Sequence, residues 1–274
     1  MTNLKILITG ASGYVGSRIY KDLKDAGFNV VGTFNNTKLF DELVKIDLTD
    51  SQQVKDLIAE VNPQIIIHTA ADAHTNTCEQ YPDYAQKINT EATKYLVDEA
   101  KTHAIRFIHL STFACFNENA SSVYAKTKLQ AERLVEELED YVIIRLSMVV
   151  GLSPNQTSKN FYNDLLQAYK ADVPFEADSS WQFEMSYLGN VVNLMKQIIS
   201  KHEIKQVMIP YADEGLTSKY NIAKDLLGGK AIETVSNRSI PLPELNLTVF
   251  DKYSLQRGEY EQCIEDMRQE LTTC

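Results

Sequence analysis

The chain has 274 residues, with 27 Lys and Arg against 37 Asp and Glu, so its formal net charge is −10. Hydrophobic residues make up 44% and charged residues 23%, which excludes a disordered or collagen-like chain. The acidic balance and the lack of a basic tract argue against nucleic acid or an anionic membrane as a partner. Apolar runs are too short to cross a bilayer and the N-terminus is unlike a signal peptide, so we expect a cytoplasmic protein.

The cysteines and histidines indicate neither disulfides nor a metal. The four cysteines lie far apart and form no Cys-x-x-Cys pair, which is typical of reduced thiols. The five histidines show no spacing of metal ligands, so we expect no metal site.

The first half of the chain alternates short apolar runs with helical patterns. Apolar runs predict strands at 4–9, 29–33, 65–68, 106–110 and 141–146, and helical periodicity predicts helices over 14–26, 51–61, 84–101 and 122–138. This alternation is typical of a parallel sheet covered on both faces. We therefore predict a doubly wound α/β fold, with a dinucleotide-binding Rossmann domain over 1–150. Ligands of such sheets bind beyond the carboxyl ends of the strands, where we expect six residues to converge: Thr9, His68, Thr69, Ser111, Thr112 and Ser147.

After Gly151 the alternation weakens and prolines separate shorter elements. Helices are predicted over 160–170, 187–200 and 259–271, and a strand over 206–209. We interpret 151–274 as a smaller C-terminal substrate lobe, from which a segment near 187–210 returns to the sheet.

A glycine-rich turn lies between the first predicted strand and helix. Its glycines are spaced by three residues, which suits a tight turn, a close approach of a pyrophosphate to the backbone, and close packing of helix on strand. At the first strand-to-helix junction of an α/β chain, this pattern predicts a dinucleotide site. The expected cofactor contacts here are Gly10, Ser12, Gly13, Tyr14, Val15 and Gly16.

The end of the second strand bears on the choice of cofactor. An acid there would bind the ribose of NAD, but Asn35, Asn36 and Lys38 stand in this stretch instead. Lys38 and Arg18 are cations suited to a 2′-phosphate, so we expect NADP, with NAD as the open alternative and solvated surface charges as the ordinary explanation. Asp47 and Leu48 are candidates for contact with the adenine, although Asp47 equally suits a turn.

A Tyr-x-x-x-Lys pair places Tyr124 and Lys128 on one face of a predicted helix. A neighbouring ammonium stabilises a phenolate, which would lower the pKa of Tyr124 toward neutrality. The spacing alone is equally that of an ordinary amphipathic helix. Thr112, at the end of the fourth strand, adds a hydroxyl suited to the same substrate oxygen.

These motifs, in this order, resemble the extended short-chain dehydrogenase/reductase family. Within it the chain is most similar to dTDP-4-dehydrorhamnose reductases (RmlD-like), to NAD-dependent epimerase/dehydratase proteins, and to the related regulatory subunits of methionine adenosyltransferase. The matching positions beyond the glycines and the Tyr-Lys pair are His68-Thr69-Ala70-Ala71, Cys78-Glu79, Pro82, Ala85-Gln86, Ile88-Asn89, Ser111-Thr112 and Phe116.

The resemblance implies an NADP-dependent oxidoreductase that reduces a keto group of a nucleotide-linked sugar. Tyr124 would protonate the substrate oxygen, Lys128 would hold the nicotinamide ribose, and Thr112 would orient the carbonyl. Further implied cofactor contacts are Thr69, Ala70, Ala71 and Asn89, although Asn89 is nearly as well explained as a structural amide.

The substrate side departs from the family pattern. The segment Ser111–Phe116 lacks the usual Asp-Tyr pair, Thr75-Asn76 replaces Val-Asp, and residues 117–123 are much shorter than the corresponding loop. The sugar is therefore left open. So are two other functions, a non-catalytic NADP-binding regulatory subunit and a sugar-nucleotide epimerase or dehydratase. The oligomeric state is open as well, a homodimer being one alternative.

Overall fold

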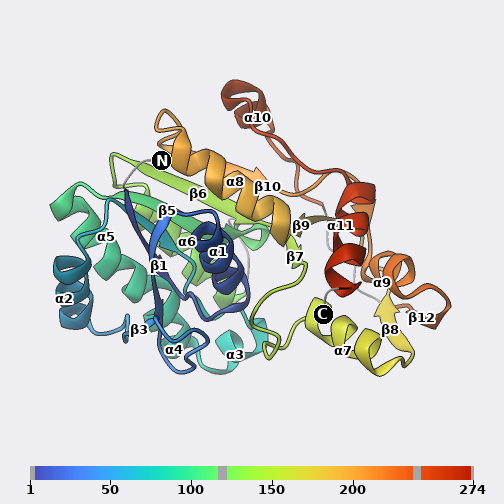
Figure 1. Ribbon diagram of the computed structural model, residues 1–274. Helices are drawn as coiled ribbons and strands as arrows, with labels where there is room; N and C mark the ends of the chain where they lie inside the picture. The colour runs from blue at the N-terminus through green and yellow to red at the C-terminus, as the bar shows by residue number, and fades with distance from the viewer. Residues whose placement is uncertain (1–3, 117–121, 237–241, 273–274) are drawn as a thin grey trace.

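The central element is a seven-stranded sheet. The computed structural model describes residues 4–116, 122–236 and 242–272. All neighbouring strands of the sheet are parallel, and their order is β10-β6-β5-β4-β1-β2-β3 (Figure 1). The chain builds outward from β1 in one direction and then in the other, as in Rossmann folds. The strands are β1 (Lys5–Thr9), β2 (Asn29–Phe34), β3 (Val44–Lys45), β4 (Ile65–His68), β5 (Arg106–Thr112), β6 (Tyr141–Leu146) and β10 (Val207–Tyr211).

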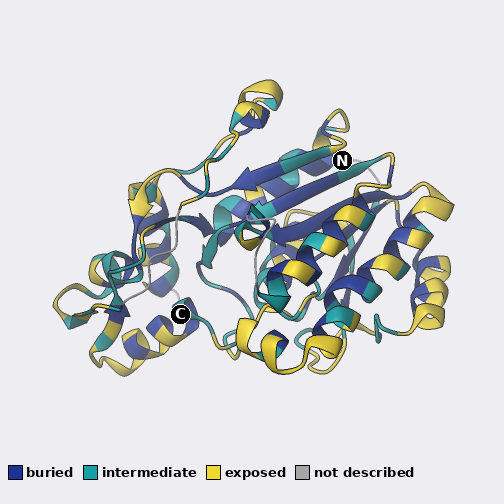
Figure 2. Ribbon diagram, turned by 180° about the vertical axis from the view of Figure 1, so that it is seen from behind, coloured by how far each residue is buried: buried dark blue, intermediate teal, exposed yellow. Residues whose placement is uncertain are grey.

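Helices cover both faces of this sheet, because successive strand residues point to opposite sides. Ile6 and Ile8 pack in a core with α1 (Tyr14–Asp25) and α8 (Leu188–Ser200). Leu7, between them, packs in a second core with α2 (Ser51–Val61), α5 (Ala92–His103) and α6 (Val123–Val135). Figure 2 shows the buried strands and the exposed residues on the outer faces of the helices. The predicted doubly wound α/β fold is confirmed.

The helix predicted over 84–101 is more irregular than its sequence pattern. It begins as α4 (Pro82–Gln86), widens into a π-helical turn, η1 (Lys87–Glu91), and continues as α5. The short helix α3 (Thr75–Gln80) precedes it. Such π turns are frequent at functional sites, and this one contains Asn89.

The C-terminal part forms a third core beside the sheet. Its elements are β7 (Met148–Val150), α7 (Phe161–Ala171), β8 (Phe175–Asp178), β9 (Phe183–Tyr187), β11 (Leu216–Thr217), α9 (Lys219–Leu227), η3 (Gly228–Lys230), β12 (Ala231–Thr234) and α11 (Tyr260–Thr272). The strands make two small sheets, β11-β9-β7 and β12-β8. The segment containing α8 and β10 returns to the main sheet, where β10 pairs with β6 and α8 packs on α1.

Helix α10 (Thr248–Tyr253) lies apart from the rest of the C-terminal part (Figure 1). Val249, Phe250 and Leu255 join the core that contains α1 and α8.

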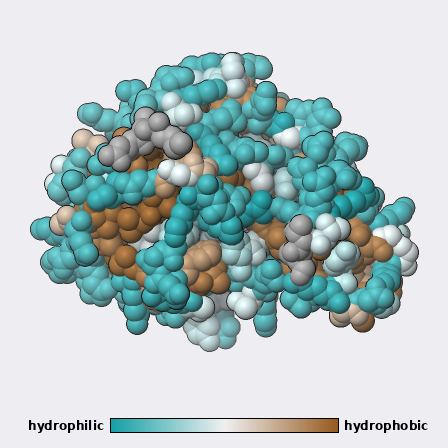
Figure 3. Space-filling view, in the orientation of Figure 1, coloured by the Kyte–Doolittle hydropathy of each residue, from teal (hydrophilic) through white to brown (hydrophobic). Residues whose placement is uncertain are grey.

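The face in Figure 3 is mostly hydrophilic, with apolar areas over both parts of the molecule. Within the described ranges, no helix is both long and apolar enough to span a membrane.

Candidate functional site

Two adjoining cavities lie at the carboxyl ends of the central strands. The first has a volume of about 300 Å³ and the second about 450 Å³. Gly13, Thr69 and Ala71 line both, so the glycine-rich turn separates two halves of one continuous site. A parallel sheet of this order binds its ligands at this edge.

The glycines of the turn are required by close packing. Gly10 has φ +73°, and a Cβ there would lie 2.8 Å from the backbone of Ala70. A Cβ on Gly16 would lie 2.2 Å from the carbonyl oxygen of Gly10 and 2.4 Å from Oγ1 of Thr69. Gly13 is the N-cap of α1, whose first turn carries no acidic residue, so the positive end of the helix faces the shared wall of the cavities. The turn therefore suits an anionic group held by backbone amides.

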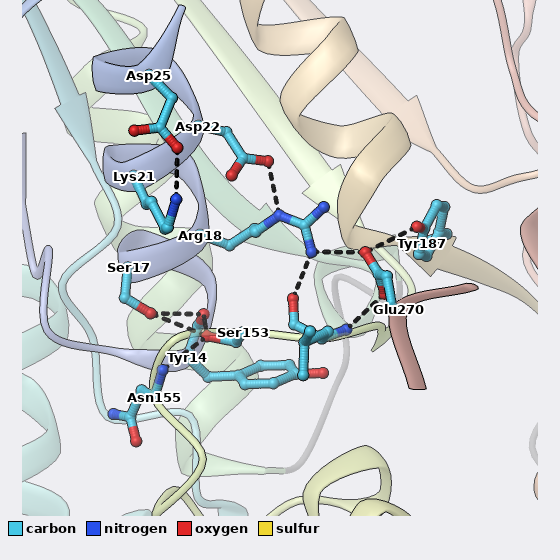
Figure 4. Close-up of polar contacts among 11 residues, drawn as sticks. Tyr14, Ser17, Arg18, Lys21, Asp22, Asp25, Ser153, Asn155, Tyr187 and Glu270 are labelled. Atoms are coloured by element: carbon cyan, nitrogen blue, oxygen red, sulfur yellow. Dashed lines mark hydrogen bonds and ion pairs between the residues drawn. The ribbon is translucent and has the colours of Figure 1, made fainter. Parts of the chain in front are cut away.

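The start of the C-terminal part is bonded directly to this turn (Figure 4). The Tyr14 hydroxyl donates to the carbonyl oxygen of Gly151 at 2.6 Å, and the Ser153 hydroxyl donates to the carbonyl oxygen of Tyr14 at 2.6 Å. The amide of Asn155 donates to the carbonyl oxygen of Ser12 at 2.6 Å. The turn is thus fixed from both sides, by the sheet and by residues 151–155.

Arg18 belongs to this second set of contacts and not to the cofactor site. Its guanidinium donates to Asp22 at 2.6 Å, to Glu270 of α11 at 2.7 Å and to the carbonyl oxygen of Leu152 at 2.6 Å (Figure 4). Arg18 lines neither cavity. The interpretation of Arg18 as a partner for a 2′-phosphate is therefore wrong, because two carboxylates and a backbone oxygen already hold the side chain against the C-terminal part.

The first cavity contains most of the residues expected around the adenosine. Asn35, Asn36 and Leu48 line it, whereas Lys38 and Asp47 do not. The Asp47 carboxylate accepts from the backbone and hydroxyl of Thr49, so it acts as a turn residue. Sequence reasoning missed seven further lining residues, which are Thr33, Phe34, Thr37, Ile46, Tyr84, Ile88 and Ala92.

Thr33 is the most informative of the residues that were missed. It is 1% exposed, and its hydroxyl has no hydrogen-bond partner among the described residues. A buried hydroxyl without a partner is costly, and this one belongs to a residue in the wall of the first cavity. Its position near the end of β2, just before Asn35, was the available signal.

The second cavity brings together Thr112, Tyr124 and Lys128. Tyr124 is the second residue of α6, whose start is well defined because Ser122 caps it and Glu79 accepts from the amide of Val123 at 2.7 Å. Thr112 ends β5, and Lys128 is one turn along α6 from Tyr124. The three polar side chains therefore reach one space from two elements.

The electrostatics of Tyr124 differ from the expectation. Burial raises the pKa of the Tyr124 phenol well above its usual value, and a hydrogen bond with the Thr112 side chain opposes this effect. Lys128 donates instead to the carbonyl oxygen of Leu110 at 2.8 Å and contacts Nε2 of His109 at 3.1 Å. The predicted lowering of the phenol pKa by Lys128 is therefore wrong for this state, because the ammonium is turned toward β5 and burial dominates.

Three polar residues near the strand ends lie beneath the site and not in its wall. Thr9 and His68 are buried and hydrogen-bonded to each other at 2.7 Å, which corrects their expected place in the cleft. Asn89 also lines neither cavity. Its side chain accepts from the amide of Asp72 at 2.8 Å and donates to the carbonyl oxygen of Asp72 and to Oγ1 of Thr127, both at 3.1 Å. Asn89 thus fixes the loop after β4, a structural role.

Comparison with known proteins gives this arrangement a family. The family described as the RmlD substrate binding domain matches residues 4–244. The chain belongs to this family. The resemblance to extended short-chain dehydrogenases/reductases that the motifs predicted is confirmed.

Relatives of this RmlD-family chain differ in what they are named for. The beta subunit of methionine adenosyltransferase 2 from Bos taurus is 30% identical over 162 residues, 54% of this chain and 48% of that protein. The probable low-salt glycan biosynthesis reductase Agl14 from Haloferax volcanii is 31% identical over 159 residues, 53% of each. The chain spans about half the length of these curated relatives. Bacillus anthracis dTDP-4-dehydrorhamnose reductase, solved with NADP, shares the fold at 18% identity, with a TM-score of 0.81 over 98% of this chain and 99% of that one.

The remaining wall of the second cavity is formed largely by the loop after β4 and by the segment that follows β6. His74 and Ser147 line it, together with residues that sequence reasoning missed, including Met148, Val149, Ser158, Lys159, Asn160 and Phe161. Asn160 caps α7, a signal visible in the sequence, although nothing local shows that α7 starts beside the cavity. The shortened segment between Phe116 and Tyr124 falls largely on residues 117–121, outside the described residues.

Proposed function

We propose that this protein is an NADP-dependent reductase of a keto group on a nucleotide-linked sugar. The observation that carries the proposal is that Thr112, Tyr124 and Lys128 line one cavity, which adjoins a second cavity across the glycine-rich turn. A proton donor, a hydroxyl and a cation in one pocket are what the reduction of a carbonyl needs beside a hydride source.

The residues present fit a nicotinamide dinucleotide. Gly10 and Gly16 leave no room for side chains where the turn approaches its neighbours, and the N-terminus of α1 offers amides for a pyrophosphate. Thr33, whose buried hydroxyl has no hydrogen-bond partner among the described residues, is one of the residues that line the first cavity. The polar wall after β2 is formed by Asn35, Asn36 and Thr37, which carry no negative charge and so favour NADP over NAD.

The mechanism assigns one task to each of the three residues. The bound cofactor would supply the hydride to the ketone carbon. Tyr124 donates its phenolic proton to the carbonyl oxygen, so that the C=O group becomes CH–OH and the phenolate is left on the enzyme. Its raised pKa keeps the phenol protonated in the resting state. Thr112 orients the carbonyl and supports the phenolate by its hydrogen bond, and Lys128, in the wall of the same cavity, would hold the nicotinamide ribose.

The activity is tested by mixing the protein with NADPH and a panel of nucleotide-linked keto sugars. We expect oxidation of NADPH by the wild type and a loss of at least about 100-fold in kcat for Tyr124→Phe. Tyr169→Phe is the matched control, because Tyr169 is a half-exposed phenol on α7, away from both cavities. Turnover that survives in Tyr124→Phe would remove the proposed role of Tyr124.

The same titrations separate the alternatives. NADPH binding without turnover on any sugar would favour the regulatory subunit, to which the 30% identity with the beta subunit of methionine adenosyltransferase 2 lends support. Cofactor choice is tested by Asn36→Asp, with exposed Asn193→Asp as the control. A carboxylate at 36 should weaken NADPH about 10-fold relative to NADH. Tighter binding of NADH than NADPH by the wild type would contradict the proposal for NADP.

A further inference from the structure

A row of buried polar side chains crosses three strands on the face of the sheet that α2, α5 and α6 cover. Strand pairing sets Thr9 beside His68, and His68 beside His109, on β1, β4 and β5. Two residues earlier on the same face, these strands carry Leu7, Ile66 and Phe107, all in the apolar core. This face of the sheet therefore changes from apolar to polar residues near the carboxyl ends of the strands. The polar residues are nevertheless buried, since His68 is only 1% exposed and His109 is fully buried.

His68 is completely satisfied as a neutral ring. The hydroxyl of Thr93 donates to the carbonyl oxygen of Asn89 at 2.8 Å, so it can only accept from Nε2 of His68, 3.0 Å away. Nδ1 of His68 then accepts from the hydroxyl of Thr9 at 2.7 Å. This ring has both nitrogens occupied by groups that carry no charge, so its role is structural.

His109 is different, because its partner is the lysine of the site. Nε2 of His109 lies 3.1 Å from Nζ of Lys128, which also donates to the carbonyl oxygen of Leu110 at 2.8 Å. Nδ1 of His109 is buried without a hydrogen-bond partner in the described part of the chain. An ammonium has three N–H donors. Two of them are held by β5, and since Lys128 lines the second cavity, the third is available to a ligand there.

Burial keeps the imidazole of His109 neutral. Burial first, and then the electrostatic influence of Lys128 and of His68, hold the pKa of His109 well below its usual value. Burial lowers the pKa of Lys128 to about 8, against the opposing influence of Cys115 and Glu132.

The other groups around this pair are already accounted for. Glu132 is paired with Arg145 at 2.6 Å, and Tyr124 keeps its proton. Of the three adjacent basic groups, His68, His109 and Lys128, only Lys128 therefore carries a positive charge.

We propose that His109 is the positioning residue for Lys128: its neutral Nε2 accepts a hydrogen bond that stabilises the buried ammonium and holds it with one N–H left for the ligand. The inference rests on the proposed function only in that Lys128 serves a ligand of the second cavity. It predicts that an acceptor at position 109 matters more than the shape of the ring.

The test compares His109→Phe, which keeps a planar ring but removes the acceptor, with His109→Gln, whose amide oxygen restores one. The pKa of Lys128 is measured in the ligand-free protein by NMR of ¹³Cε-labelled lysine, with the Lys128 signal assigned by its loss in Lys128→Met. We expect the pKa in His109→Phe to fall by about 1 or more and the pKa in His109→Gln to stay within about 0.3 of the wild type. His109→Leu gives the same comparison if His109→Phe does not fold.

Activity provides an independent readout. In His109→Phe the basic limb of the pH profile of kcat/KM should move to lower pH, and His109→Gln should restore it. An unchanged or raised Lys128 pKa in folded His109→Phe would overturn the inference, since a merely structural ring would leave it unmoved. A wild type that reduces no sugar would instead contradict the proposed function, while the pKa comparison in the ligand-free protein would still decide the role of His109.

Discussion

The packing of Gly16 against Gly10 makes Gly16→Ala a quantitative test of the turn. The new methyl group would lie 2.2 Å from the carbonyl oxygen of Gly10, whereas ordinary contacts of a Cβ begin at 3.4 Å, so the two must separate by about 1.2 Å. The carbonyl belongs to the backbone of the turn and cannot rotate away. Helix α1 therefore has to move relative to β1.

The cost follows from known substitutions of small residues by larger ones. Overpacking costs about 1–3 kcal/mol, and the higher helix propensity of Ala returns up to about 1 kcal/mol. We expect a net loss of about 1–2 kcal/mol in the free energy of unfolding, or a fall in Tm of about 3–6 °C. Because the same displacement deforms the wall shared by both cavities, the Kd for NADPH should rise at least about 10-fold.

Urea unfolding and NADPH titration measure the two effects. Gly13→Ala should be intermediate, since its Cβ would meet the same oxygen at 3.2 Å, and exposed Gly229→Ala is the control because nothing lies within 4 Å of its Cβ. Equal stability and equal NADPH affinity across the three variants would refute the argument that close packing of the turn shapes the site.

Two further predictions concern groups away from the glycines. Arg18→Met should lower the free energy of unfolding by about 2–3 kcal/mol, because Glu270 and Asp22 lose a partner whose side chain is only 17% exposed. The control Lys94→Met breaks an exposed pair with Asp98 and should change the free energy of unfolding by less than about 0.5 kcal/mol. Equal losses for the two variants in urea unfolding would contradict this prediction. The second prediction concerns the pH dependence of stability. The pKa of Lys128 in the folded protein, about 8, lies below its usual value of 10.5, so between these pH values the unfolded chain binds more protons than the folded protein. The contribution of Lys128 to stability therefore rises with pH through this window. The stability of the wild type relative to Lys128→Met should therefore increase from about pH 7.5 to about pH 9.5, and a constant or falling difference would contradict it.

The sequence determined six of the seven strands of the main sheet, all but the two-residue β3, and the position of the glycine-rich turn, because these depend on local chemistry. Buried parallel strands read as short apolar runs, and the predicted strand over 141–146 coincides with β6. The glycines are needed where backbone approaches backbone, so Gly10 and Gly16 are visible in the sequence without knowledge of the rest of the fold. Tyr124 and Lys128 were found because one turn of helix separates them.

The tertiary structure alone decided which polar groups serve the site. Arg18 is a cation close in sequence to the glycine-rich turn, yet Glu270, far along the chain, holds it away from both cavities. His68 and His109 are neighbours only because β4 and β5 pair in that register, and Lys128 is held on β5 by its contacts with His109 and the carbonyl oxygen of Leu110. The strands of the C-terminal part, such as β11 and β12, are two and four residues long and pair with distant segments, so local periodicity carries little signal for them. Local pattern sets which residues form an element, whereas the direction of a long polar side chain depends on the partners that folding brings to it.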